Sequence, residues 1–262
     1  MLVLLPPSEG KAAGGRGRPV ALDGLSLPEL ARPRATVLDE LVGLCSADED
    51  KAAEVLGLTP GLRGEVARNA GLRTAPAMPA GRLYTGVLYE ALGLATLDAA
   101  ARRRANASLL VFSGLWGALR LTDRVPAYRC SMGVRLPGVG GLAAYWKPWL
   151  DAALPEAAGG GLVLDLRSSA YAAAWKPRGD LAARTAHVRV LQVAVVDGVE
   201  RRTVVSHFNK ATKGRLVRAL LEAGARPRTP AALASALRDL GFTVEHDPRS
   251  PTRLDVLVRD LH

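Results

Sequence analysis

The chain has few of the residues that build disulfide frameworks or metal centres. Among its 262 residues there are two cysteines, Cys45 and Cys130, and four histidines. Two cysteines support neither a disulfide framework nor a cysteine metal site. The histidines show no ligand spacing such as HxxxH or HExxH. We therefore expect a reduced protein with no dedicated metal and no cofactor.

Long hydrophobic runs are also missing. No stretch approaches the roughly 20 consecutive apolar residues that cross a bilayer. The apolar start, residues 1–6, is too short for a signal sequence and has no basic residues before it. It predicts a buried strand instead. We expect a soluble, cytoplasmic protein with no membrane partner.

Acidic residues are scarce relative to basic ones. The chain has 35 Lys and Arg against 25 Asp and Glu, a formal charge of +10. An excess of this size attracts polyanions at long range. It predicts DNA or another phosphate-bearing partner, although basic proteins without an anionic partner also exist.

Short apolar runs alternate with segments in which apolar residues recur every three and four positions. The pair Asp197-Gly198 between two β-branched runs is typical of a hairpin. No repeat or linker divides the chain, so we expect one compact α+β domain over residues 1–262, with a mixed sheet and flanking helices. Strands are expected at 2–5, 108–112, 161–166, 187–196, 201–207, 242–246 and 253–259, and helices at 35–46, 48–56, 60–71, 86–93, 96–105, 142–153, 210–224 and 229–240.

The segment 201–221 is strongly basic and has no acidic residue. On a helix beginning near Lys210, Lys210 and Lys213 continue the core-facing stripe, whereas Arg215 and Arg218 point outward. Two inward lysines beside the free N–H groups of a helix N-terminus predict an anion site. The alternative is that both lysines extend to water or pair with carboxylates.

The two helices expected within about 210–240 form a helix-hairpin-helix-like unit. Pro230 suits the first turn of the second helix. Arg226 and Arg228 lie in the turn, where they could contact a phosphate chain. An ordinary helical hairpin packed on a sheet is the alternative.

Two predicted strands end in small polar loops, at Ser113 and at Ser168. Ligands of α/β proteins favour the carboxyl ends of strands. Basic residues interleaved with Tyr and Trp follow the first loop, which suits phosphate contact and base stacking. A core position is the alternative for any single tryptophan, Trp116 included. The absence of GxSxG, Walker A and strand-linked GxGxxG motifs argues against a serine hydrolase and the common nucleotide-binding loops.

Seven short motifs occur in a defined order between residue 1 and about 220. They are Leu5-Pro-Pro-Ser-Glu-Gly-Lys11, Tyr84-Thr-Gly86, Ser113-Gly-Leu-Trp-Gly117, Tyr128-Arg-Cys-Ser-Met-Gly133, Tyr145-Trp146, Asp165-Leu-Arg-Ser168 and Ser206-His-Phe-Asn-Lys210. As a set they resemble the YaaA peroxide-stress family, although each motif alone is weak. The last forty residues match poorly, and the segment Ser8-Glu-Gly-Lys11 departs from the Ala-Lys pair of other branches.

The resemblance implies a cytoplasmic bacterial protein of the oxidative stress response that limits free iron. It also implies DNA binding through a compact α+β fold with a positively charged cleft and a helix-hairpin-helix element. The residues that match the family's cleft are Tyr84, Thr85, Ser113, Tyr128, Arg129, Arg135, Ser168, Tyr171, Lys210 and Lys213; Lys11, Trp116, Arg215 and Arg218 complete our candidate set.

Two hypotheses follow. In the first, the protein binds DNA without sequence preference, through phosphate contacts from the basic helix. In the second, it is an enzyme acting on a nucleotide, nucleobase or similar small anion in the same cleft. Arg129, Arg135 and Lys210 would then hold the anion and Trp116 or Tyr171 would stack on its ring. Glu9, Asp123 or Tyr128 would handle protons.

Overall fold

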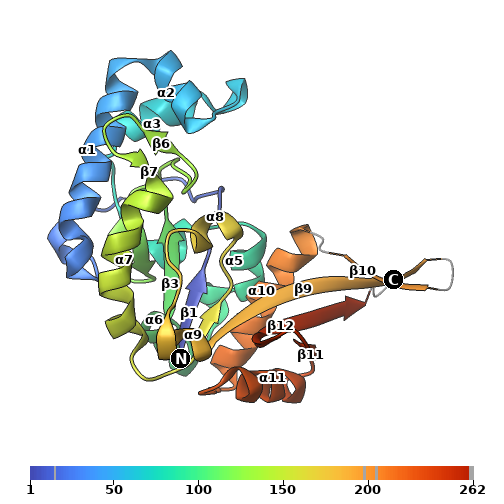
Figure 1. Ribbon diagram of the computed structural model, residues 1–262. Helices are drawn as coiled ribbons and strands as arrows, with labels where there is room; N and C mark the ends of the chain where they lie inside the picture. Colours follow the sequence, from blue (N-terminus) through green and yellow to red (C-terminus); the bar gives the residue numbers. More distant parts are fainter. Residues whose placement is uncertain (15, 197–198, 204–205, 260–262) are drawn as a thin grey trace.

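The computed structural model describes residues 1–14, 16–196, 199–203 and 206–259. Its centre is a mixed eight-stranded sheet (Figure 1). In spatial order the path runs β11 (Thr243–Asp247), β12 (Ser250–Arg259), β9 (Thr185–Val196), β8 (Val163–Asp165), β1 (Leu2–Leu5), β3 (Leu109–Ser113) and β4 (Gly117–Arg120), with β10 (Val199–Thr203) paired to β9.

The middle of this sheet is parallel. Strand β1 lies between β3 and β8 and is parallel to both, with Val3 opposite Leu109 on one side and Leu164 on the other. All four residues of β1 are buried, as expected for a strand covered on both faces. Because these strands run the same way, their carboxyl ends meet at one edge of the sheet. That edge holds the candidate site.

The helices form separate groups. The groups comprise α1 (Ala31–Ala47), α2 (Glu49–Leu56) and α3 (Gly64–Ala70), which contact one another; α5 (Val87–Leu92) and α6 (Ala99–Ser108), which contact α10 (Ser206–Glu222); α7 (Leu142–Ala158), beside β4; and α11 (Pro230–Asp239), on β11 and β12. Shorter elements are α4 (Ala80–Leu83), α8 (Ser169–Ala172), α9 (Gly179–Ala183) and the strand pairs β2 (Met78–Pro79) with β5 (Arg124–Val125) and β6 (Arg135–Leu136) with β7 (Gly140–Gly141).

Helix α10 lies unusually close to α5. Gly214 makes this possible, because a Cβ at this position would overlap the carbonyl oxygen of Leu88. The buried stripe of α10, which includes Leu216, Val217 and Leu220, completes the contact with the core. A helix packed in this way has one face for the protein interior and leaves only the other for a ligand.

The expected α+β class and mixed sheet are confirmed, and the hairpin of β9 with β10 is antiparallel as predicted. Its turn, 197–198, lies outside the described residues. The expected strand 201–207 is wrong at its end, because α10 begins at Ser206. The amides at the start of this helix therefore belong to residues 206–209, and Lys210 is not at its N-terminus.

The two helices of the expected helix-hairpin-helix unit are present, but they pack mainly on different partners. Helix α10 lies on α5 and α6, while α11 covers β11 and β12. The phosphate-binding role of this unit stays a prediction. Within the described ranges, no helix is long and apolar enough to span a membrane.

Candidate functional site

The loop after β1 brings Lys11 beside Tyr84. The Lys11 backbone forms an isolated antiparallel bridge with Tyr84. The Ser8 hydroxyl oxygen accepts the Thr85 backbone N–H at 3.1 Å. Next to it, the Ala12 N–H donates to the Leu83 carbonyl at 2.8 Å. Backbone pairing thus fixes the side chain of Lys11 at the carboxyl edge of the sheet.

A chain of hydroxyl groups lies beneath Lys11. The Tyr128 hydroxyl is 2.6 Å from the Ser113 hydroxyl and 2.9 Å from the Tyr84 hydroxyl. The Ser113 oxygen also accepts the Trp116 backbone N–H at 2.9 Å. Ser113, Tyr84 and Tyr128 are all buried. These hydroxyls are mutually satisfied in the interior, which makes the chain rigid.

The Ser113–Gly117 turn positions this chain, and its glycines are needed. A Cβ at Gly114 would lie 2.6 Å from the Cys130 carbonyl oxygen, and one at Gly117 would lie 2.9 Å from the Trp146 ring. Gly117 also has a φ of +71°, which favours glycine. The Trp146 indole N–H donates to the Gly114 carbonyl at 2.8 Å. The turn is therefore packed on both sides.

The Lys11 ammonium lies over the Tyr128 ring, with 4.4 Å from Nζ to the ring centroid, and 5.7 Å from the Tyr84 centroid. Nζ donates to the Ser8 carbonyl at 3.2 Å. Lys11 makes no ion pair in the part of the chain that the structure describes. Burial lowers the pKa of Lys11 to about 8, and the nearby charge of Glu9 offsets part of this effect. A cation held by aromatic rings, without a carboxylate, has room for an external anion.

Glu9 and Arg129 form an ion pair beside Lys11, with 3.1 Å between Glu9 Oε2 and an Arg129 guanidinium nitrogen. The side chain of Glu9 is 61% exposed and that of Arg129 is 26% exposed. Asn69 fixes the Arg129 backbone by accepting its N–H at 2.9 Å and donating to its carbonyl at 2.8 Å. We call Glu9, Lys11, Tyr84, Ser113, Tyr128 and Arg129 the Lys11 centre.

Four of the five tyrosines in the chain interact around this centre: Tyr84, Tyr89, Tyr128 and Tyr171. Tyr84 and Tyr89 stack with their ring centroids 5.6 Å apart. Burial raises the pKa of all four phenols above the ordinary value of 10. The charge of Glu9 raises the pKa of Tyr171 further. At neutral pH these groups remain protonated, so they can donate hydrogen bonds but cannot act as bases.

A second buried cluster follows β8. Asp165 accepts two hydrogen bonds from the Arg167 guanidinium, at 2.8 and 2.7 Å. This guanidinium also lies 4.3 Å from the centroid of the Phe112 ring and donates to the Tyr171 carbonyl at 3.3 Å. His187 lies 3.6 Å from Asp165. Although it is buried, Asp165 keeps a pKa below its ordinary value through its hydrogen bonds to Arg167.

The four cations expected on the basic helix have different surroundings. The Lys213 ammonium donates to the Leu166 carbonyl at 3.1 Å, and burial lowers its pKa. The prediction that Arg218 points outward is wrong: it donates to the Leu92 and Gly93 carbonyls at 3.2 and 3.0 Å. The Leu92 carbonyl is at the end of α5, where it has no partner within its own helix; the Gly93 carbonyl also accepts the Thr96 N–H. Arg215 is exposed, as predicted. The prediction that Lys210 continues the core-facing stripe is wrong, because Lys210 is exposed.

Other expected site residues have structural surroundings. Asp123 is buried, and its carboxylate accepts the Ser26 N–H and hydroxyl and the Arg120 N–H. It is fully engaged and lies outside the Lys11 centre. Trp116 is completely buried, with its ring edge-on to Tyr128 at 6.2 Å, so it cannot stack on a ligand. Arg135 and Ser168 are exposed on β6 and before α8.

The structure therefore joins Tyr84, Ser113, Tyr128 and Arg129 with Lys11 and Glu9, and Tyr171 links this group to the Arg167 cluster. Among the described residues, no contact joins the Ser168 or Lys210 side chains to it.

The role of the buried Arg34 was not predicted from the sequence: its guanidinium donates to the Trp116, Ala118 and Ser26 carbonyls at 3.1, 2.7 and 2.8 Å. Arg167 was predicted only as part of a motif. A charged residue directly after a buried strand is the signal that could have identified Arg167.

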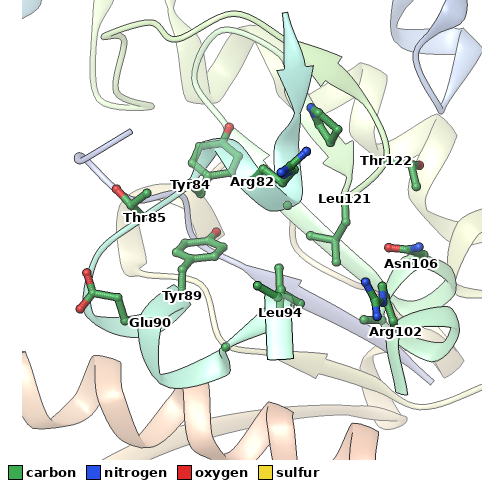
Figure 2. Close-up of a pocket in the computed structure, with 15 residues that line it drawn as sticks. Arg82, Tyr84, Thr85, Tyr89, Glu90, Leu94, Arg102, Asn106, Leu121 and Thr122 are labelled. Atoms are coloured by element: carbon green, nitrogen blue, oxygen red, sulfur yellow. The ribbon is translucent and has the colours of Figure 1, made fainter. Parts of the chain in front are cut away.

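A groove has Tyr84, one residue of the Lys11 centre, in its wall (Figure 2). Its volume is about 970 Å³, and its walls include Tyr84, Thr85 and Tyr89. Tyr84 thus contributes its hydroxyl to the Lys11 centre and part of its ring to the groove. Of the residues expected in the site, only Tyr84 and Thr85 line this space.

The fold and the site define an α+β protein whose parallel strand ends carry a buried lysine–tyrosine centre. A family model described as "Peroxide stress protein YaaA" matches residues 1–247. The chain therefore belongs to the YaaA peroxide stress family, as the motif set indicated.

Several relatives agree with this assignment. A UPF0246 protein of Streptomyces coelicolor is 64% identical over 266 residues, covering 100% of both chains. A UPF0246 protein of Corynebacterium efficiens is 40% identical over 247 residues, 94% of this chain and 95% of its own. An uncharacterized protein of Campylobacter jejuni is 30% identical over 146 residues, 56% of this chain and 54% of its own.

Proposed function

We propose that this protein serves in the peroxide stress response by binding a phosphate-bearing ligand at the Lys11 centre. The family description supports the stress role. The observation that carries the ligand is the Lys11 ammonium, which is largely buried over Tyr128 with no carboxylate paired to it. A bound phosphate would supply the missing negative charge, and the neighbouring Arg129 would provide further donors.

The ligand phosphate belongs either to DNA or to a small ester. The formal charge of +10 favours DNA. Lys213 and Arg218 are less available for phosphate contact, because both already donate hydrogen bonds to backbone carbonyls of the protein. Lys210, Arg215, Arg226 and Arg228 remain exposed. If these four contact duplex phosphates, the slope of log affinity against log salt should be about −4.

Lys11→Met tests the proposal, with Lys51→Met as the matched control, because Lys51 is exposed on α2 and paired with Glu54. Peroxide survival of a deletion strain should be restored by the wild type and by Lys51→Met, but not by Lys11→Met. In vitro, phosphate binding should perturb the Lys11 side-chain resonance. Full survival with Lys11→Met would reject the Lys11 centre as the functional site.

An enzyme acting on a small anion is the second candidate. The lowered pKa of Lys11, about 8, favours it, because part of the amine is then unprotonated near neutral pH. The Tyr128–Ser113 hydroxyl chain would donate to the substrate. A catalytic role predicts that Tyr128→Phe lowers the turnover of a nucleotide substrate more than its binding. If the protein only binds the nucleotide, Tyr128→Phe should weaken its binding, and the wild type should show no turnover.

A further inference from the structure

The groove beside Tyr84 has an apolar middle (Figure 2). Leu94 and Leu121 lie at its centre, next to Tyr84 and Tyr89. The two tyrosines stack on each other and are 3% and 6% exposed, so only their edges reach the groove. Ring edges carry partial positive charge and attract the face of another aromatic ring. The middle of the groove therefore suits a flat aromatic group.

Polar groups lie at the two ends of this apolar surface. Glu90 and Thr85 lie at one end, and Arg102, Asn106 and Thr122 lie toward the other (Figure 2). Arg82, from α4, lies beside Tyr84 above the middle of the groove in this view. A ligand that fills the groove would meet hydrogen-bond acceptors at one end, the Arg82 guanidinium above its middle and the Arg102 guanidinium toward the other end.

The charged groups of the groove are not neutralised by the protein. Within the described ranges, neither Arg82, Arg102 nor Glu90 takes part in an ion pair. Arg102 donates one hydrogen bond to the Leu97 carbonyl at 3.2 Å, which holds its side chain near the groove. Two unpaired guanidinium groups above an apolar surface are well suited to a phosphate group attached to a ring.

We propose that this groove is a separate binding site for a small aromatic phosphate of the nucleoside monophosphate type. Its ring lies against Leu94, Leu121 and the tyrosine edges, its phosphate between Arg82 and Arg102, and a ring amino group near Glu90. This site goes beyond the phosphate site of the Lys11 centre, because it uses different cations and has only Tyr84 in common with it. A volume of about 970 Å³ accommodates such a ligand.

Isothermal titration calorimetry of the full chain with AMP tests the proposal. We expect one saturable site, weakened about tenfold or more by Arg82→Ala and by Arg102→Ala. Arg103→Ala is the matched control, since Arg103 is the exposed neighbour on α6 and does not line the groove. Adenosine, inorganic phosphate and octanoate should each bind at least about tenfold more weakly than AMP, because each lacks the ring or its phosphate.

Lys11→Met separates this site from the Lys11 centre and should change AMP affinity by less than about twofold. The proposal is overturned if AMP shows no saturation at roughly millimolar concentration. It is equally overturned if Arg103→Ala weakens AMP binding as much as Arg82→Ala does. If octanoate binds as tightly as AMP, the groove does not select an aromatic phosphate. If Lys11→Met abolishes AMP binding, the nucleotide binds at the Lys11 centre instead.

Discussion

The cations of this protein lie in two contrasting regions. At the carboxyl edge of the sheet, Lys11 and Arg167 are withdrawn from water and held by rings, carbonyls and one buried carboxylate. On β10 and α10, Arg202 and Arg215 are exposed, and Arg202 is shared between Glu200 and Glu245 at the surface. The segment 201–221, which is rich in basic residues and has no acidic one, lies mostly in this second region.

This difference shows that density of charge along a chain is a poor guide to where an anion can bind strongly. A surface arginine is screened by salt and water, and its pairing contributes little. A single buried ammonium without a carboxylate interacts far more strongly with whatever anion reaches it. Two of the four cations predicted as ligand contacts on α10 instead satisfy carbonyl groups at the ends of other elements.

The largest expected effect comes from breaking the buried ion pair. Arg167→Met should lower the free energy of unfolding by about 3–5 kcal/mol, because the buried Asp165 carboxylate would lose the two hydrogen bonds from the guanidinium. Arg202→Met, which breaks an exposed pair, should leave it nearly unchanged. Urea denaturation of both variants measures this. Equal losses would show that the two regions do not differ energetically.

The next effect concerns α10. Arg218→Ala should lower the free energy of unfolding by about 1–3 kcal/mol, because the Leu92 carbonyl would lose its side-chain donor and Glu222 its ion-pair partner. The Gly93 carbonyl would keep the Thr96 N–H and hydroxyl. Arg215→Ala, three residues earlier and exposed, should be almost neutral in stability. The same denaturation experiment, combined with a DNA-binding assay at low salt, separates the roles. If Arg215→Ala weakens DNA binding without affecting stability, the exposed cations are the DNA contacts.

Lys11→Met should stabilise the protein by roughly 1–3 kcal/mol at pH 7 while removing function. The pKa of Lys11 is lowered to about 8 by burial, from an ordinary value of 10.5. Between these values the unfolded chain binds more protons, so wild-type stability rises with pH. The gain in stability of Lys11→Met over the wild type is therefore complete below about pH 8 and is lost by about pH 10.5. A constant difference across this range would contradict a buried, charged Lys11.

The smallest effect is expected at the cysteines. Burial raises the pKa of the Cys130 thiol to about 12 and also raises that of Cys45. Peroxide reacts with the thiolate, which is almost absent at neutral pH in such a site. Cys45→Ala and Cys130→Ala should leave peroxide survival unchanged. Rapid thiol labelling of the folded protein, or lost survival in either variant, would identify a redox role for these residues.

Much of the site could be predicted from the sequence. Polar residues directly after β1 and β3 must meet, because the carboxyl ends of parallel strands share an edge. This places Ser113 beside the residues that follow Leu5. The phase of α10 separates Lys213 from Arg215 correctly but puts Lys210, which is exposed, on the wrong face.

The rest depends on neighbours that a helical period does not reveal. Arg218 has an inward partner only because the end of α5 lies against α10, where Gly214 permits the contact. Asp123 was predicted to handle protons, but its carboxylate accepts a hydrogen bond from Ser26, a residue far away in the sequence. The groove was not predicted, since its walls come from short elements with no motif of their own.

The position of β1 has a consequence for how the chain is made. Val3 lies opposite Leu109 on one side and Leu164 on the other. Strand β1 therefore leaves the ribosome long before either of its neighbours exists. Closing such distant pairings is slow compared with forming the local helices. Until β8 emerges, Leu2–Leu5 remain an uncovered apolar segment of the kind that holding chaperones bind and that nascent chains aggregate through.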